Sequence, residues 1–157
     1  MTVRVGDPAP AFELEGIEGT GEGTDTYALS EFQGRPVVLV FYPADNSAVC
    51  TRQLASYTAE FSRFAAVDAE LLGISPQSIE SHRHFAISNG GFAFPLLADS
   101  DKAVGKAYGV LGPVGFYKRS VFVVDGEGII CYAHRATAGL SFRSTEEIVS
   151  AVRSLSP

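Results

Sequence analysis

The sequence has few of the side chains that bind metal ions or build structural disulfides. Its 157 residues include two cysteines, Cys50 and Cys131, and three histidines. The cysteines lie so far apart in the sequence that no zinc-ligand spacing is present. In a reducing compartment two cysteines rarely form a structural disulfide. We therefore expect free thiols, a transient redox pair, or one reactive thiol and one buried thiol.

Long apolar segments and clusters of basic residues are also missing. The longest apolar run, residues 36–42, is much shorter than the roughly 20 residues that a membrane-spanning helix needs. Residues 1–10 contain no apolar run and no basic lead-in, so we expect no signal peptide and a cytoplasmic protein without a membrane partner. The net charge of -6 and the scattered Lys and Arg residues argue against nucleic acid as a partner.

The pattern of apolar residues predicts an α/β fold. Hydrophobic residues make up 46% of the chain, enough for the core of one domain over residues 1–157. Short apolar runs predict strands, and helical spacing, capping residues and glycine stops predict helices between them. The first of these strands is apolar throughout, which is typical of a central strand covered on both faces. The strands are expected at residues 36–42, 70–75, 120–124 and 129–133, and the helices over 50–64, 78–89, 101–108 and from Ser144 onward.

This order of elements predicts a three-layer sandwich with a mixed central sheet. Parallel neighbouring strands need helical crossovers, and the sequence supplies helices in the right places. The turn signal at residues 125–128 then joins the last two strands as an antiparallel hairpin. Residues 16–26 are rich in glycine, threonine and acidic residues, and are expected to form a loop or a hairpin tip.

Cys50 lies where a cysteine can become reactive. It follows the predicted central strand across the turn formed by residues 43–49, and it falls in the first turn of the next helix. Backbone N–H groups in a first helical turn have no helical partner, and the helix dipole adds partial positive charge. Both features favour the thiolate, which is the nucleophilic form of cysteine. A small buried hydrophobic residue is the alternative interpretation of the same position.

The turn before Cys50 resembles the active-site pattern of the peroxiredoxins. Pro43, Ser47 and Cys50 match the pattern Pro-x-x-x-Thr/Ser-x-x-Cys of that family. The resemblance covers nearly the whole chain and is strongest to the bacterioferritin-comigratory (PrxQ-like) and AhpE-like branches. It implies a thioredoxin-like three-layer sandwich and a thiol peroxidase. Further matching segments lie at residues 6–12, 73–75, 94–99, 108–110 and 119–125.

The resemblance implies a role for each matching residue. Cys50 would attack a hydroperoxide and become a sulfenic acid. Arg119 matches the active-site arginine of the family, whose fixed guanidinium would hold the thiolate and polarise the O–O bond. The Ser47 hydroxyl would hydrogen-bond the thiolate and the peroxide, and Pro43 would shield the cysteine. Each also has an alternative structural role: Ser47 as a turn or capping residue, and Pro43 as the residue that ends the strand. Sulfur carries the electrons, so no metal, haem or flavin cofactor is implied.

The chain departs from the family pattern at the residue that would resolve the sulfenic acid. Many PrxQ-like proteins carry a second cysteine five residues after the first, where this chain has Ala55. Cys131 is the remaining candidate. A hairpin that turns over Gly126–Glu127 pairs Arg119 with His134 and directs Cys131 to the opposite face of the sheet. A one-residue change in register would reverse that face.

We therefore expect a one-cysteine cycle, in which an external thiol reduces the sulfenic acid. The reductant would be a low-molecular-weight thiol or a thioredoxin- or glutaredoxin-type protein. A two-cysteine cycle in which Cys131 resolves the sulfenic acid is the alternative. We expect His82 and His84 at surface or half-buried positions, without a catalytic role. The protein would act as a monomer or a homodimer.

Two other functions fit the same fold. A thiol–disulfide oxidoreductase would need a Cys-x-x-Cys motif, but this chain continues from Cys50 as Thr-Arg-Gln. A non-enzymatic holdase or binding module would not need Pro43, Ser47, Cys50 and Arg119 together. The sequence therefore favours the peroxidase.

Overall fold

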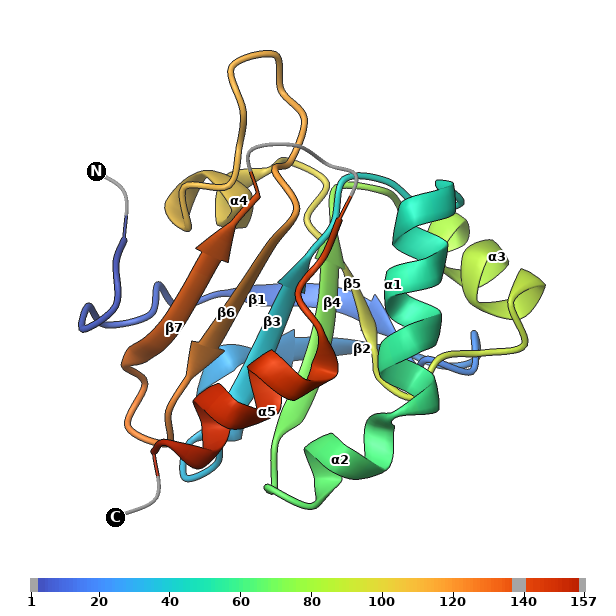
Figure 1. The fold of residues 1–157 in the computed structure, drawn as a ribbon. Helices are drawn as coiled ribbons and strands as arrows, with labels where there is room; N and C mark the ends of the chain where they lie inside the picture. The colour runs from blue at the N-terminus through green and yellow to red at the C-terminus, as the bar shows by residue number, and fades with distance from the viewer. Residues whose placement is uncertain (1–2, 137–140, 156–157) are drawn as a thin grey trace.

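The protein is built around a single mixed sheet, as a computed structural model shows (Figure 1). The structure describes residues 3–136 and 141–155. Within these residues the sheet has seven strands in the order β2-β1-β5-β4-β3-β6-β7. The strands are β1 (Glu13–Ile17), β2 (Thr24–Ala28), β3 (Val37–Phe41), β4 (Glu70–Ser75), β5 (Leu96–Ala98), β6 (Ser120–Val124) and β7 (Ile130–Arg135).

The middle of the sheet is parallel and its edges are antiparallel. β3 and β4 are parallel to each other, and so are β4 and β5. The β1–β2, β1–β5, β3–β6 and β6–β7 pairs are antiparallel. Helices cross between the parallel strands, as the sequence predicts. They are α1 (Ala48–Ala59), α2 (Phe61–Ala65) and α3 (Ile79–Ser88), followed by α4 (Ala103–Ala107) and α5 (Thr145–Arg153).

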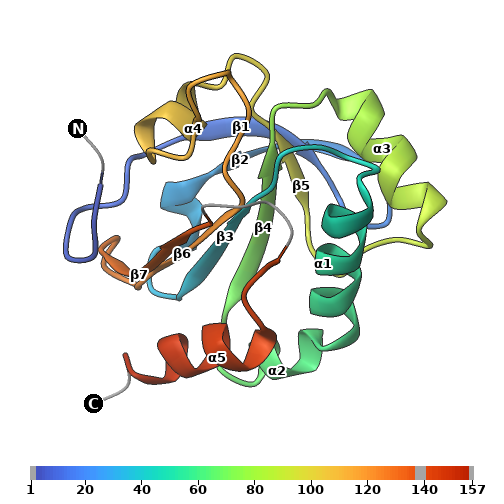
Figure 2. The same cartoon turned by 45° about the horizontal axis from the view of Figure 1, so that its top comes forward.

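Two hydrophobic cores lie on opposite faces of the sheet and give the molecule three layers. One core lies under α1, α2, α3 and α5, and the other lies under α4 and the segments beside it. Figure 2 shows α4 on one side of the sheet and α1 and α5 on the other. Alternate residues of β3 enter the two cores, with Val38 and Val40 on the first side and Leu39 and Phe41 on the second. The prediction that this strand is covered on both faces is confirmed.

The sequence pattern does not reveal every element. The helix expected over residues 50–64 is interrupted at Glu60, whose backbone angles are φ -107° and ψ 19°. β1, β2 and β5 are missed, because β5 has only three residues and β2 is rich in polar residues. Residues 16–26 form the turn of the β1–β2 hairpin together with parts of both strands. Among the described helices, none is long and apolar enough to cross a membrane.

The predicted register of the last hairpin is wrong. Val121, rather than Arg119, lies opposite His134. The loop is longer than a two-residue turn because the Asp125 N–H bonds to the carbonyl of Ile129 across residues 126–128. Gly128 takes a left-handed conformation with φ 84°, as three-residue hairpin loops require. The extra loop residue shifts the pairing of the two strands.

A bulge in the same hairpin changes the face on which Cys131 lies. The pairing shifts between Val123 and Val124, which leaves Cys131 as the unpaired extra residue. Cys131 packs against the core that also contains Cys50. The prediction that Cys131 faces away from the Arg119 side of the sheet is therefore wrong.

The packing of the second core predicts that two phenylalanines contribute very differently to the free energy of unfolding. Phe122 is fully buried and its ring lies against Phe41 and Tyr108, whereas Phe116 is 69% exposed. We expect Phe122→Ala to lower the free energy of unfolding by about 3–5 kcal/mol, because it leaves a cavity. Phe116→Ala should change it by no more than about 0.5 kcal/mol. Urea denaturation of both variants checks this, and equal midpoints would contradict the packing described.

Candidate active site

The turn after β3 places Cys50 at the start of α1. Ser47 caps the helix, since its Oγ accepts the Cys50 backbone N–H at 3.1 Å. The residue before it, Asn46, has a left-handed backbone with φ 67°. Cys50 is the third residue of α1 and is fully buried. Its sulfur therefore lies at the positive end of the helix dipole, in the first helical turn that the sequence predicts.

Arg119 reaches Cys50 from the neighbouring strand. β3 and β6 are antiparallel with Phe41 opposite Ser120, so the residue before β6 lies beside the turn that follows β3. Arg119 is 4% exposed, and its Nη2 donates to the Cys50 Sγ at 3.3 Å. A hydrogen bond from a charged donor stabilises a sulfur anion more than a neutral thiol. The structure thus brings Cys50, Ser47 and Arg119 together.

A relay of hydrogen bonds holds the other side of the guanidinium. The Arg119 Nη1 donates to the Gln53 Oε1 at 2.6 Å, and the Gln53 Nε2 donates to the Tyr57 hydroxyl at 3.3 Å. That hydroxyl donates to the Arg143 carbonyl at 2.5 Å. Gln53 and Tyr57 are fully buried, and burial raises the pKa of Tyr57 to about 12. The phenol therefore stays a donor at neutral pH.

Gln53 and Tyr57 were not expected in the site. The sequence identifies Tyr57 only as an apolar position of a helix. A signal for Gln53 exists, however, because it follows Cys50 by one helical turn and so lies on the same face of α1. A buried glutamine needs partners for both its carbonyl and its amide group, and here Arg119 and Tyr57 provide them.

Pro43 lies at the opening of the turn and is half-buried. Behind it, a second group of polar side chains anchors the turn. The Asp45 carboxylate accepts hydrogen bonds from Tyr42 at 2.8 Å and from Ser81 at 2.7 Å, and lies 2.7 Å from the His82 Nδ1. The His82 side chain is 0% exposed, so the expectation of a surface or half-buried position is wrong. His84, on the same helix, is exposed as expected.

Cys131 is half-buried and lies away from Cys50. Its Sγ donates to the Val123 carbonyl at 3.3 Å, and burial raises the pKa of the thiol to about 11. Val123 follows Arg119 by four positions along the strand, or about 13 Å at roughly 3.3 Å per residue. A disulfide needs Cα atoms within about 7 Å of each other. Cys131 could reach Cys50 only after local unfolding.

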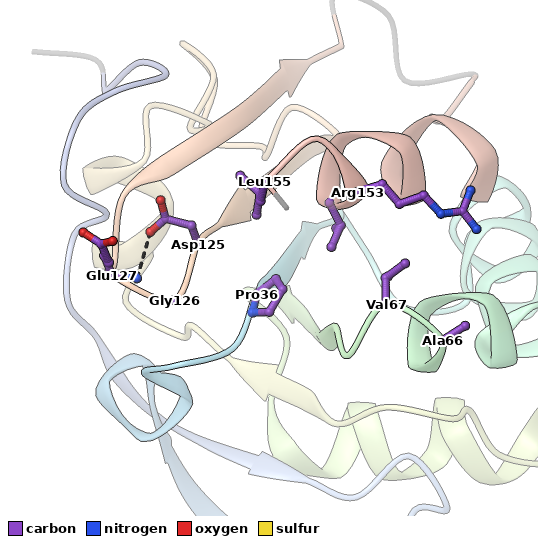
Figure 3. Close-up of a pocket in the computed structure, with 9 residues that line it drawn as sticks. Pro36, Ala66, Val67, Asp125, Gly126, Glu127, Arg153 and Leu155 are labelled. Atoms are coloured by element: carbon purple, nitrogen blue, oxygen red, sulfur yellow. Dashed lines mark hydrogen bonds between the residues drawn. The ribbon is translucent and has the colours of Figure 1, made fainter. Parts of the chain in front are cut away.

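A groove lies at the other end of the sheet. It has a volume of about 600 Å³, and Pro36, just before β3, is on its wall. Cys50 follows the opposite end of the same strand. Figure 3 shows apolar side chains in the groove, with Asp125, Glu127 and Arg153 around them. None of the predicted site residues lines this groove. In the described part of the chain no group of three His, Cys, Asp or Glu side chains could hold a metal ion.

Comparisons with known proteins give a consistent picture. The sequence pattern of the AhpC/TSA family matches residues 5–133. A chloroplastic 2-cysteine peroxiredoxin of Chattonella marina is 32% identical over 99% of this chain and 82% of that protein. Peroxiredoxin Q from the chloroplast of Sedum lineare is 36% identical over 82% of this chain and 67% of that protein. The structure of Mycobacterium tuberculosis AhpC is similar with a TM-score of 0.88 and 26% identity, covering 100% of both chains.

The bonds from Arg119 to Cys50 and Gln53 predict the effect of replacing it by lysine. A lysine keeps the charge but lacks the planar fork that serves Cys50 and Gln53 at once. We expect Arg119→Lys to slow the oxidation of Cys50 by hydrogen peroxide about 10²-fold, the usual effect of losing one donor to a reacting anion. Quenched-flow alkylation with mass spectrometry measures this rate. Lys118→Ala, at the exposed neighbouring position, is the control, and equal rates for both variants would refute the role of the fork.

Proposed function

Given that this chain belongs to the AhpC/TSA family and is a peroxiredoxin-type thiol peroxidase, we propose that Cys50 reduces hydroperoxides in a one-cysteine cycle. The contact between the Arg119 guanidinium and the Cys50 sulfur carries the proposal. In this contact the Cys50 sulfur is a nucleophile that is stabilised as an anion. The guanidinium is a cation directed at the reacting atom. The substrates are hydrogen peroxide and organic hydroperoxides.

The first step is a displacement at oxygen. The Cys50 thiolate attacks the terminal peroxide oxygen, an S–O bond forms and the O–O bond breaks. The leaving oxygen takes a proton and departs as water or an alcohol, and Cys50 becomes a sulfenic acid. Arg119 donates to the sulfur and is placed to stabilise charge on the breaking O–O bond. Ser47 fixes the helix start on which Cys50 lies, and Pro43 shields Cys50.

The second step uses an external thiol. One thiol condenses with the sulfenic acid and releases water, and a second thiol attacks the resulting mixed disulfide. Cys50 is returned as a thiol, and the two reductant sulfurs leave as a disulfide. The reductant is a low-molecular-weight thiol or a thioredoxin- or glutaredoxin-type protein.

The position of Cys131 supports this cycle over a two-cysteine cycle. Its thiol is bonded to the Val123 carbonyl, and its raised pKa leaves little thiolate at neutral pH. Cys131 also packs against the same core as Cys50, so a two-cysteine cycle would begin with unfolding of the last hairpin. That cycle is the alternative that the experiment must separate.

Intact mass after one equivalent of hydrogen peroxide distinguishes the two cycles. We expect the protein to gain one oxygen, and to form a dimedone adduct at Cys50, rather than to lose two hydrogens in an internal disulfide. Cys131→Ser should keep full turnover with an external thiol, because Cys131 takes no part. Cys50→Ser should abolish turnover. Loss of turnover in Cys131→Ser, with peroxide reduction intact in a single turnover, would establish the two-cysteine cycle instead.

A further inference from the structure

The polar group behind the catalytic turn contains an unusual pair of buried side chains. Asp45 and His82 lie 2.7 Å apart, and their side chains are 1% and 0% exposed. The other His82 nitrogen, Nε2, lies 2.9 Å from the Leu97 carbonyl in β5. Buried polar groups persist only when they are hydrogen-bonded. The pair therefore has to satisfy both ring nitrogens.

The positions of the protons follow from the partners. A carbonyl oxygen only accepts, so the His82 Nε2 must carry a proton toward Leu97. A neutral imidazole has then only a lone pair at Nδ1, and this would face a carboxylate oxygen. A proton must consequently lie between Nδ1 and Oδ2 as well. The Tyr42 and Ser81 hydroxyls also donate to the Asp45 carboxylate, so the pair lies in a network of buried hydrogen bonds.

This pair connects the catalytic turn to two other elements. Asp45 lies between Pro43 and Ser47 in the turn, and its backbone N–H donates to the Gln77 Oε1 at 2.9 Å. His82 belongs to α3 and bonds to β5. Asp45 precedes Asn46, whose left-handed conformation has to be held by its surroundings. A displacement of Asp45 is therefore transmitted to Ser47 and to the first turn of α1.

We propose that His82 is a positioning residue for the peroxidase reaction, acting through the proton that it shares with Asp45 to hold the turn that carries Cys50. The proposal rests on the proposed function of Cys50. His82 does not touch the reacting atoms. It sets the place of the helix start, and hence the distance between the Cys50 sulfur and the guanidinium.

Without the shared proton a lone pair would face a carboxylate in a buried site, and the bond that holds the turn would be lost. Burial, followed by the charge of Asp45, raises the pKa of Tyr42 well above its usual value of 10, so the phenol stays a donor to the Asp45 carboxylate at neutral pH. On α3 itself, Glu80 and His84 are exposed and Arg83 donates to the Gly21 carbonyl.

Three variants test the proposal in the full-length protein. His82→Leu removes both bonds and should slow Cys50 oxidation by hydrogen peroxide about 10²-fold, the effect of a misplacement of about 1 Å. His82→Asn places an amide N–H where Nδ1 stands, and this donor does not titrate. It should recover much of the rate that His82→Leu loses. His84→Asn, at the exposed position of the same helix, should match the wild type.

The outcomes separate this proposal from the proposed function. A wild-type protein that reacts with peroxide no faster than free cysteine would refute the peroxidase function of Cys50. A wild type that reacts fast, together with a His82→Leu variant of equal rate, would refute the positioning role alone. A His82→Asn variant as slow as His82→Leu would also refute it, because the restored donor would then have no effect.

A direct spectroscopic readout keeps the proposal testable if His82→Leu fails to fold. Nitrogen-15 spectra of the histidine-labelled wild type report whether each ring nitrogen carries a proton, and His82→Asn assigns the signals. We expect a proton at Nε2, facing the Leu97 carbonyl, and a proton shared between Nδ1 and the Asp45 carboxylate. A His82 ring whose Nδ1 shares no proton with Asp45 would overturn the proposal.

Discussion

Burial of the Arg119 guanidinium against the Cys50 sulfur is the constraint around which the site is arranged. The two residues are 69 positions apart in the sequence, and only the antiparallel pairing of β3 with β6 brings them together. A buried cation is costly unless it is paired and its N–H groups are bonded. The interaction that stabilises a thiolate at Cys50 is therefore also one that the fold needs in order to bury Arg119.

Two hydrogen-bond networks hold the partners of this contact from opposite sides. Gln53 and Tyr57 connect the guanidinium to the backbone before α5. Asp45 and His82 connect the turn that carries Cys50 to α3 and β5. Each network ends on a backbone carbonyl, so neither depends on a surface side chain. A site that is held by rigid elements on both sides keeps its reacting atoms in place without reorganisation.

Sequence alone predicts the parts of this arrangement that have local signals. The apolar β3, the serine cap and the position of Cys50 in a first helical turn all follow from short patterns, and Arg119 follows from family resemblance. The register of the last hairpin does not, because one extra loop residue and a bulge at Cys131 leave the alternation of apolar residues almost unchanged. The burial of His82 is also hidden, since its partners Asp45 and Leu97 come from other elements.

The same rigidity sets a requirement on the second half of the reaction. The Cys50 side chain is fully buried, so a reductant larger than a peroxide cannot reach its sulfenic acid in the closed structure. An outward movement of the first turn of α1 would expose the sulfur, but it would break the cap at Ser47 and strain the turn that Asp45 anchors. The hydrogen bond between Asp45 and His82 thus favours the oxidation of Cys50 and opposes the reduction of its sulfenic acid. Rapid turnover requires that this bond be strong enough to place the thiolate and weak enough to let the oxidised turn open.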